Sequence, residues 1–414
     1  MLKRWFEIAL WKRVLGALVL GIIVGSLWGK GAESISLIGE IFLRLIRMVI
    51  VPLIFLTLIS GVIAMGDPKK LGSIGIRTLS MYIGTTAVAI TIGLIVATII
   101  SPGVGVDISG ATPKETSDAK SLADILRGII PENPIQAFAD ANVLAVIFFS
   151  LLFGIGILLA GEKGKPMANV FDSGAEVIIK VTGIVMEFAP FGVFALIAKV
   201  TGTQGVAALL GVVPFALSFV IAVLLQIFLV HGAIISFLLK LPPVRFFKGI
   251  LDAQMVAFST SSSSATLPVT ISVAEHNLGI KPTIAGSVLP LGSTINMDGT
   301  AIYVGIAAIF SAQVFGIDLS FADYLLIAFS TTLVSIGTAG IPSASLFLLA
   351  AVLEPIGITP DNTALIVGFL FAFDRPLDML RTVVNITGDL SVSSAVAKWE
   401  GELDEETFKA QPVE

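Results

Sequence analysis

The 414-residue chain contains no cysteine and only two histidines, His231 and His276. The absence of cysteine excludes a disulfide framework, a thiolate metal site and a cysteine nucleophile. Two histidines are too few for a haem or a histidine-rich metal centre. Charged residues are also scarce, at 13% of the chain against about 25% in soluble domains. The small net charge of −5 indicates no nucleic-acid partner.

Apolar residues make up 55% of the chain, and its mean hydropathy is +0.98. This composition predicts a polytopic membrane protein. The N-terminus is basic and then apolar, but it shows no clear small-residue cleavage site, so we interpret it as an uncleaved first helix. A spanning helix needs about 20 residues. Segments of that length predict an all-α protein with eight transmembrane helices, at residues 11–29, 37–65, 76–102, 143–161, 174–200, 205–239, 283–316 and 361–397.

Two further apolar segments, 242–278 and 319–358, are interrupted at their middle by small and helix-breaking residues. The interruptions are 259–268, which is rich in serine, and 335–343, which carries two glycines and a proline. Bare backbone at membrane depth is tolerated only where it is buried or lines a cavity. We therefore predict two re-entrant helical hairpins that build a binding site from half-helices. Kinked spanning helices remain the alternative.

The distribution of lysine and arginine predicts the topology. Lys3, Arg4, Lys12 and Arg13 place the N-terminus in the cytoplasm. Later basic turns then make the first hairpin enter from the cytoplasm and the second from outside, as an inverted repeat requires. The polar, acidic segment 401–414 is predicted to be a disordered cytoplasmic tail. The chain is thus expected to be a multi-pass protein of the cell membrane with both termini inside.

The last apolar segment carries five ionisable residues, Asp374, Arg375, Asp378, Arg381 and Asp389. A charge at the centre of a spanning helix costs about 2.5–3.5 kcal/mol on insertion scales. Four of the five, all except Arg375, fall with two other polar residues within roughly 100° of one helix face. Such a polar stripe predicts a site for substrate or ions. The alternative is a buried ion-pair network that holds two helices together.

Two groups of polar residues suit a dehydrated alkali cation. The run from Asn296 to Thr300 interrupts an apolar helix and would expose backbone carbonyls. Asn385 and Asp389, one turn apart, add amide and carboxylate oxygens. A simple helix kink remains the alternative for the first group.

Asp378 and Arg381, one turn apart, suit a zwitterion that bears an extra carboxylate. Arginine grips a carboxylate through two parallel hydrogen bonds, and an aspartate can pair with an ammonium. The serine run 261–264 would add hydroxyl and N–H groups at a half-helix end. The alternative is that Asp378 and Arg381 neutralise each other.

Four motifs in order carry a family resemblance: Ser-Ser-Ser-Ala-Thr-Leu-Pro-Val-Thr, Asn-Met-Asp-Gly-Thr, Ser-Ile-Gly-Thr-Ala-Gly-Ile-Pro and Asp-Met-Leu-Arg-Thr-Val-Val-Asn-Ile-Thr-Gly-Asp. Over nearly its whole length the chain resembles the glutamate transporter family of dicarboxylate/amino acid–cation symporters. The resemblance implies a homotrimer that works by an elevator movement. It implies a scaffold domain (1–66 and the trimerising 104–198) and a transport domain (67–103 and 199–400).

The resemblance also implies a substrate site for an acidic amino acid. Asp378 would bind the α-ammonium, and Arg381, beside Thr300, would bind the side-chain carboxylate. The tip of the second hairpin would close over the substrate as the outer gate. The implied substrate-binding residues are Ser262, Ser263, Thr300, Gly340, Ile341, Ser345, Asp378, Arg381, Thr382 and Asn385.

Three sodium ions per substrate are implied in the same way. The first site would use Gly292, Asn296, Asn385 and Asp389. The second would use Thr294, Ser335, Ile336 and Thr338, and the third Tyr82, Thr85, Thr86, Asn296 and Asp298.

The chain departs from the family pattern at positions expected to modulate the site. Archaeal members carry an arginine where this chain has Ser261, and animal members carry one where it has Met379. Arg375, which follows Asp374 and lies one turn before Asp378, would take over the role of modulating the substrate site. Val304 replaces a glutamate tied to proton cotransport, so the sequence favours sodium alone. Ser345 replaces a glycine that is common at the gate.

The leading functional hypothesis is sodium-driven symport of L-aspartate or L-glutamate. The alternatives are a proton-coupled symporter of the same substrates, and a symporter for neutral amino acids or C4-dicarboxylates. A channel is disfavoured by the closed hairpins. An enzyme is least favoured, because no nucleophile–base pair or metal-ligand cluster stands out.

Overall fold

The computed structural model describes residues 8, 10–64, 68–106, 108, 127–336 and 344–412. These residues are helical throughout apart from turns and one isolated β-bridge, between Ile280 and Leu403. The α-helices are α2 (Leu10–Trp28), α3 (Ser36–Ala64), α4 (Pro68–Ile100), α6 (Pro134–Ala139), α7 (Val143–Leu159), α8 (Lys165–Met186), α9 (Ala189–Gln204), α10 (Val212–Leu224), α11 (Pro243–Gly249), α12 (Leu251–Thr260), α13 (Ser263–His276), α14 (Pro282–Ile295), α15 (Asp298–Val314), α16 (Phe321–Ile336), α17 (Ala344–Leu353), α18 (Pro360–Glu400) and α19 (Glu405–Lys409). Short 3₁₀ and π-helical segments join them at Gly29–Ile35, Gly161–Gly164, Val206–Gly211, Leu225–His231 and Ile234–Leu238.

The described residues form an all-helical fold with long apolar helices, which confirms the all-α, membrane-compatible part of the predicted fold class. By length and composition, four helical runs of the described residues are able to cross a membrane, or five if the bent pair α8 and α9 counts as one. The run Lys12–Ile63 counts once there, although it contains both α2 and α3. The predicted number of eight spanning helices therefore stays a prediction.

One of the predicted transmembrane helices is wrong. Residues 174–200 were expected to form a single spanning helix, but α8 and α9 meet there at a bend of 45°. Pro190 stands in the first turn of α9, where its missing N–H costs nothing. Beside the bend, Glu187 forms an ion pair with Arg13 of α2. A proline at a new helix start and a half-buried ion pair together fix a corner that hydropathy alone does not reveal.

Two of the predicted breaks interrupt helices, whereas most of the break predicted at 335–343 lies outside the described residues. Residues 296–297 separate α14 from α15. The first hairpin turns at Ser261, which has a φ of 54°, and the Ser262 hydroxyl then caps α13 by accepting a hydrogen bond from Ala265 N at 3.1 Å. α12 has 10 residues and α13 has 14, which is about 15 and 21 Å of helix. Neither is long enough to cross a bilayer core of about 30 Å alone.

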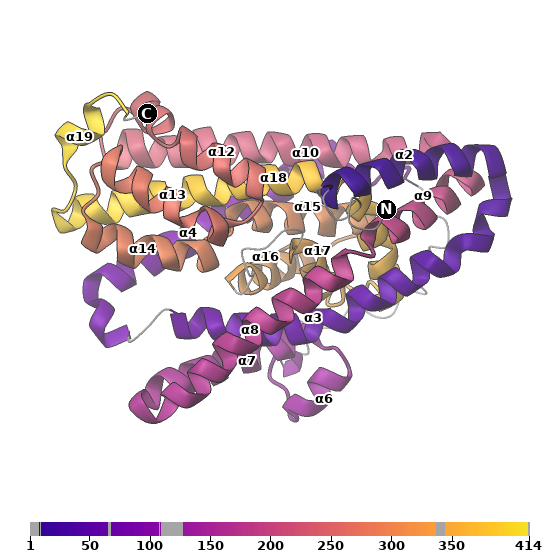
Figure 1. Cartoon of the computed structure of the whole chain (residues 1–414), viewed down its shortest axis with the longest axis horizontal. Helices are drawn as coiled ribbons and strands as arrows, with labels where there is room; N and C mark the ends of the chain where they lie inside the picture. Colours follow the sequence, from indigo (N-terminus) through magenta and orange to yellow (C-terminus); the bar gives the residue numbers. More distant parts are fainter. Residues whose placement is uncertain are drawn as a thin grey trace.

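The helices form two groups, which Figure 1 shows around the long helices α18 and α3. Helices α2, α3, α7, α8 and α9 pack chiefly on one another, whereas α4 and α10 to α18 pack chiefly on one another. Helices α12, α13, α14, α15 and α17 all contact α18. The second group therefore surrounds the helix that carries the charged stripe.

The C-terminal segment differs from its prediction. Residues 401–412 are ordered against the end of the second helix group, beside α11 and α13 (Figure 1). The backbone N–H of Lys281 donates to Glu402 O, that of Asp404 donates to Gly279 O, and Phe408 is fully buried. Lys398 and Lys409 hydrogen-bond Glu405 and lower the pKa of its carboxyl to about 2. The stability that these two interactions contribute to the folded protein is present above the usual pKa of 4.5 and is lost only as the pH falls toward 2.

Phe408→Ala is expected to destabilise the protein by about 3–5 kcal/mol, because it removes a large buried ring from a packed cluster. Thermal unfolding of the purified protein would show this as a lower midpoint. Lys409→Ala is the matched control on the same short helix, and its loss of an exposed ion pair should change the midpoint little. An unchanged midpoint for Phe408→Ala would mean that the segment does not dock.

Candidate functional site

The charged stripe of α18 is buried. As whole residues, Asp374, Asp378, Arg381 and Asp389 are each less than 5% exposed. Pairs of buried charges persist only when they are matched and hydrogen-bonded. The partners of these four residues therefore define what the stripe does.

Arg381 is shared by two carboxylates. Its Nη2 donates to Asp374 Oδ1 at 2.7 Å and to Asp378 Oδ1 at 2.6 Å, and its guanidinium lies 4.1 Å from the ring centroid of Tyr303. Arg375 lies 3.5 Å from the other oxygen of Asp378. The Nε and Nη1 atoms of Arg381 are buried, and neither has a hydrogen-bond partner among the described residues. The predicted neutralisation of Asp378 by Arg381 is therefore present, yet it leaves the Nε and Nη1 donors of the guanidinium without a partner among the described residues.

Glycine brings α15 against this arginine. A Cβ atom at Gly299 would lie 2.4 Å from the carbonyl oxygen of Arg381, so only glycine permits this approach. Gly299 N also donates to Asn385 Oδ1 at 2.8 Å. The contact fixes the start of α15, and with it the buried Thr300, beside Arg381.

A second cluster lies further along α18. Asn296 Nδ2 donates to Asp389 Oδ1 at 3.0 Å and to Asn385 O at 3.3 Å. A Cβ atom at Gly292 would lie 2.4 Å from Asp389 Oδ1 and 2.5 Å from the hydroxyl of Tyr82. The structure thus brings together the four residues predicted for the first cation site. Amide, carbonyl and carboxylate oxygens of this kind suit a hard cation.

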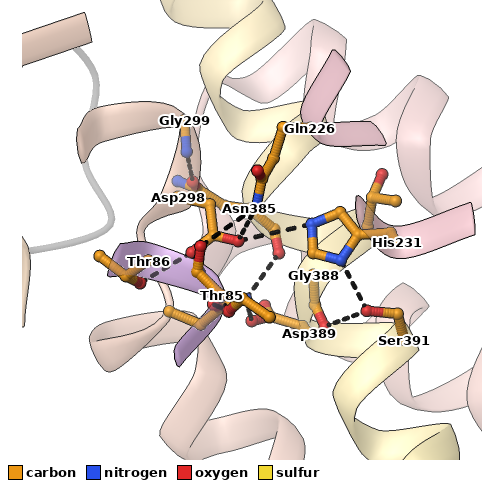
Figure 2. Close-up of polar contacts among 12 residues, drawn as sticks. Thr85, Thr86, Gln226, His231, Asp298, Gly299, Asn385, Gly388, Asp389 and Ser391 are labelled. Atoms are coloured by element: carbon orange, nitrogen blue, oxygen red, sulfur yellow. Dashed lines mark hydrogen bonds and ion pairs between the residues drawn. The ribbon is translucent and has the colours of Figure 1, made fainter. Parts of the chain in front are cut away.

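Asp298 is the centre of a third cluster, shown in Figure 2. Its Oδ1 accepts from Thr86 at 2.7 Å and from Thr85 at 3.4 Å. Thr85 Oγ1 also lies 3.3 Å from Asn296 Oδ1. Four of the five residues predicted for the third cation site therefore converge. The fifth, Tyr82, is buried and donates to Val288 O at 3.1 Å.

Sequence analysis missed the polar groups on the other side of Asp298. Gln226 Nε2 donates to Asp298 Oδ2 at 2.8 Å, and His231 Nε2 lies 3.4 Å from the same oxygen. His231 Nδ1 lies 2.9 Å from Ser391 Oγ of α18 (Figure 2). These contacts hold Asp298 so that its Oδ1 faces Thr85 and Thr86. A glutamine and a histidine inside an apolar span, in a π-helical segment, were the available signal.

The remaining predicted residues are less closely connected. Ser262 and Ser263 lie at the turn of the first hairpin, and Thr382 Oγ1 donates to Asp378 O at 3.1 Å. Ser345 and Val304 are buried. Thr294 and Ser335 each donate to a carbonyl of their own helix, and the second cation site stays a prediction because most of the second hairpin's tip lies outside the described residues. Thr338, Gly340 and Ile341 lie outside the described residues, and only the backbone of Ile336 is described.

Gly292→Ala is expected to weaken cation binding by at least about tenfold, because the new methyl group overlaps the Asp389 carboxylate. The measurement is the cation dependence of thermal unfolding midpoints, with sodium titrated against choline. Gly286→Ala on the same helix is the matched control, since a Cβ atom there meets nothing within 4 Å. Equal sodium titrations for the two variants would remove Gly292 from the site.

Comparison with known proteins assigns the family. The sequence model of the sodium:dicarboxylate symporter family matches residues 10–399. The chain is 36% identical over 414 residues to the proton/sodium-glutamate symport protein of Geobacillus stearothermophilus, covering 96% of each chain. It is 37% identical over 408 residues to the protein of that name from Bacillus subtilis, covering 94% of this chain and 92% of the relative.

A differently named relative is almost as similar. The C4-dicarboxylate transport protein of Rhizobium leguminosarum is 34% identical over 411 residues, covering 97% of this chain and 91% of the relative. Both the family model and these relatives cover nearly the whole chain, which confirms the resemblance carried by the four motifs. The chain belongs to the sodium:dicarboxylate symporter family.

Proposed function

We propose that this protein is a symporter that uses a sodium gradient to carry L-aspartate or L-glutamate across the cell membrane. The observation that carries the proposal is the buried guanidinium of Arg381. Two carboxylates share its Nη2, while Nε and Nη1 lack a partner among the described residues. These two buried N–H groups are charge-assisted donors that a substrate carboxylate could accept from.

The charges around Arg381 favour an acidic amino acid over the alternatives. A neutral substrate would leave the Nε and Nη1 donors of Arg381 unsatisfied, which is costly in a buried site. A C4-dicarboxylate has no ammonium to place beside Asp378 and would be repelled by it. The relatives bear both glutamate and C4-dicarboxylate names, so the choice rests on Asp378. Thr300, Thr382, Asn385 and the serines of the first hairpin would complete the substrate site.

The two polar clusters around Asp389 and Asp298 support sodium as the coupling ion. Each combines one carboxylate with neutral oxygen atoms, as a monovalent hard cation requires. The second cation site and the gate formed by the tip of the second hairpin are proposed from the family resemblance. With three ions per substrate, transport would be electrogenic. The relatives' name, proton/sodium-glutamate symport protein, makes proton coupling the main alternative.

The packing of the helices supports an elevator movement. The helices that would form the scaffold contact mainly one another, and those that would form the transport domain surround α18. A transport domain of this kind would move as one body within a homotrimer that is embedded in the lipid bilayer, with both chain termini in the cytoplasm. The hairpins, too short to span the bilayer alone, would enter it from opposite sides.

Uptake of radiolabelled L-aspartate into proteoliposomes tests the proposal. An inward sodium gradient is expected to drive accumulation, whereas a proton gradient in sodium-free solution is expected to drive none. Excess unlabelled L-glutamate should compete strongly and succinate weakly. Accumulation driven by protons without sodium would mean that the coupling ion is the proton and not sodium. Strong competition by succinate without any by glutamate would mean that the substrate is a C4-dicarboxylate and not an acidic amino acid.

A further inference from the structure

A cavity of about 130 Å³ lies between the two helix groups. One wall belongs to α3 of the first group, and the other to α17 and the beginning of α18 in the second group. Engineered apolar cavities of about 150 Å³ stay dry and bind benzene. The volume therefore suits a single hydrocarbon ring, whereas a whole acyl chain of a lipid would not fit. Most of the lining is apolar, and it includes Ile46, Ile50, Leu346, Ala350, Ala364 and Val367.

The cavity is separate from the sites assigned above. None of the described residues that line it belongs to the predicted substrate site or to a predicted cation site. Val367 is the lining residue of α18 nearest in sequence to Arg381, and it precedes Arg381 by 14 residues, or roughly 21 Å of helix. A ligand in the cavity would therefore bind without taking the place of an acidic amino acid on Arg381.

The ionisable side chains of the cavity favour a cation over an anion. Arg47 of α3 is already matched, because its Nη1 lies 3.1 Å from Asp361 Oδ1 of α18. The exposed carboxylate of Asp140 accepts a hydrogen bond from the neutral amide of Gln136 at 2.7 Å and forms no ion pair with the described residues. The third ionisable residue of the lining, Glu354, is also acidic. A ligand with one ring and one ammonium group thus matches both the volume and the charge.

We propose that this cavity is a binding site for a small hydrophobic ammonium compound, whose ring fills the apolar part and whose ammonium group pairs with Asp140. Such a ligand would contact α3 together with α17 and α18. It would therefore bind the arrangement shown here more tightly than one in which the two helix groups have moved apart. The exposed ion pair between Arg47 and Asp361 contributes little to holding the groups together, so the ligand would add most of the attraction there.

An occupied cavity is expected to slow transport, because the proposed elevator movement requires the two helix groups to move past each other. This effect rests on the proposed function, whereas the binding itself does not. The two are therefore measured separately, the binding in detergent solution without aspartate and the effect on movement in proteoliposomes.

Thermal unfolding midpoints of the purified protein test the binding. Phenethylammonium, neutral phenethyl alcohol and anionic phenylacetate are titrated in turn, because they share a ring and differ in charge. Phenethylammonium is expected to raise the wild-type midpoint at concentrations about two- to fivefold lower than the alcohol, which is the gain given by one exposed charge pair. Phenylacetate should raise it least. Asp140→Asn, at an exposed position that leaves the fold intact, should respond equally to phenethylammonium and the alcohol.

Ala350→Leu should abolish the response to all three compounds, because the larger side chain occupies the cavity. Ala139→Leu is the matched control, since Ala139 is exposed and does not line the cavity. In proteoliposomes, phenethylammonium should lower the maximal rate of sodium-driven aspartate uptake and leave the KM for aspartate unchanged. Uptake by Ala350→Leu should resist the compound.

A wild-type midpoint that does not respond to phenethylammonium would overturn the proposal. So would an equal response of folded Ala350→Leu, or equal wild-type responses to phenethylammonium and the alcohol. Inhibition that excess aspartate relieves would place the compound in the substrate site, and binding that leaves uptake unchanged would overturn the effect on movement. A wild-type protein that carries neither aspartate nor glutamate would fail the proposed function, while the midpoints would still decide whether the cavity binds the compound.

Discussion

Arg381→Ala is expected to weaken binding of L-aspartate by at least about 10³-fold, or about 4 kcal/mol. The guanidinium is fully buried, and its unpartnered Nε and Nη1 groups are the only cationic donors that we assign to the substrate carboxylate. Without it, the carboxylate would enter a buried site beside Asp374 and Asp378 with no positive partner on that side. Isothermal titration of the detergent-purified variant with L-aspartate at saturating sodium measures the loss.

The variant will also lose stability, and the experiment must separate the two effects. Removing the guanidinium leaves the buried Asp374 without its ion-pair partner and Asp378 with Arg375, and breaking a buried ion pair costs about 3–5 kcal/mol. Arg381→Lys keeps the charge but not the planar fork. It should therefore fold nearly as well as the wild type and still bind aspartate more weakly. Wild-type affinity in either folded variant would show that the substrate carboxylate binds elsewhere.

The parts of the site that the sequence predicted are those coded by local composition. Asn296 and Met297 break a helix, and Ser261 and Ser262 turn a hairpin, because these residues favour non-helical backbone and caps. The charged face of α18 was visible because intramembrane charge is expensive. The family resemblance then supplied roles for individual residues, and the structure brings the residues of the first and third cation sites together.

The parts that were missed depend on distant partners. Nothing near Gln226 or His231 in sequence indicates that both contact Asp298 of α15. The acidic segment after residue 400 looked disordered by composition, but Phe408 and the bridge from Leu403 to Ile280 dock it. The ion pair between Asp374 and Arg381 joins residues seven apart in sequence. The sequence therefore indicated it only as one possible pair within the polar stripe of the last helix. Tertiary contacts decided each of these cases.

Asp389→Asn is expected to weaken sodium binding by about 10²–10³-fold, since loss of one partner of a buried charge pair costs roughly 2–5 kcal/mol. Asp389 is 1% exposed, and it is the one carboxylate in the predicted first cation site, whose other members are Gly292, Asn296 and Asn385. In the wild type its Oδ1 accepts a hydrogen bond from the Asn296 amide. Asparagine nearly preserves the shape, so the fold should persist while the negative charge that holds the cation is lost.

The measurement is aspartate affinity as a function of sodium concentration. If sodium and substrate bind in a linked manner, the variant should bind aspartate weakly at low sodium and recover as sodium rises, with the whole curve moved to higher concentration. Asp361→Asn on the same helix should leave the curve where it is, because that carboxylate is exposed and far from the cluster. A curve for Asp389→Asn that overlays the wild type would exclude the carboxylate as a sodium ligand. If the aspartate affinity of Asp389→Asn stayed below that of the wild type even at saturating sodium, Asp389 would be assigned to the substrate site instead. Raising the sodium concentration compensates only for the loss of a cation ligand.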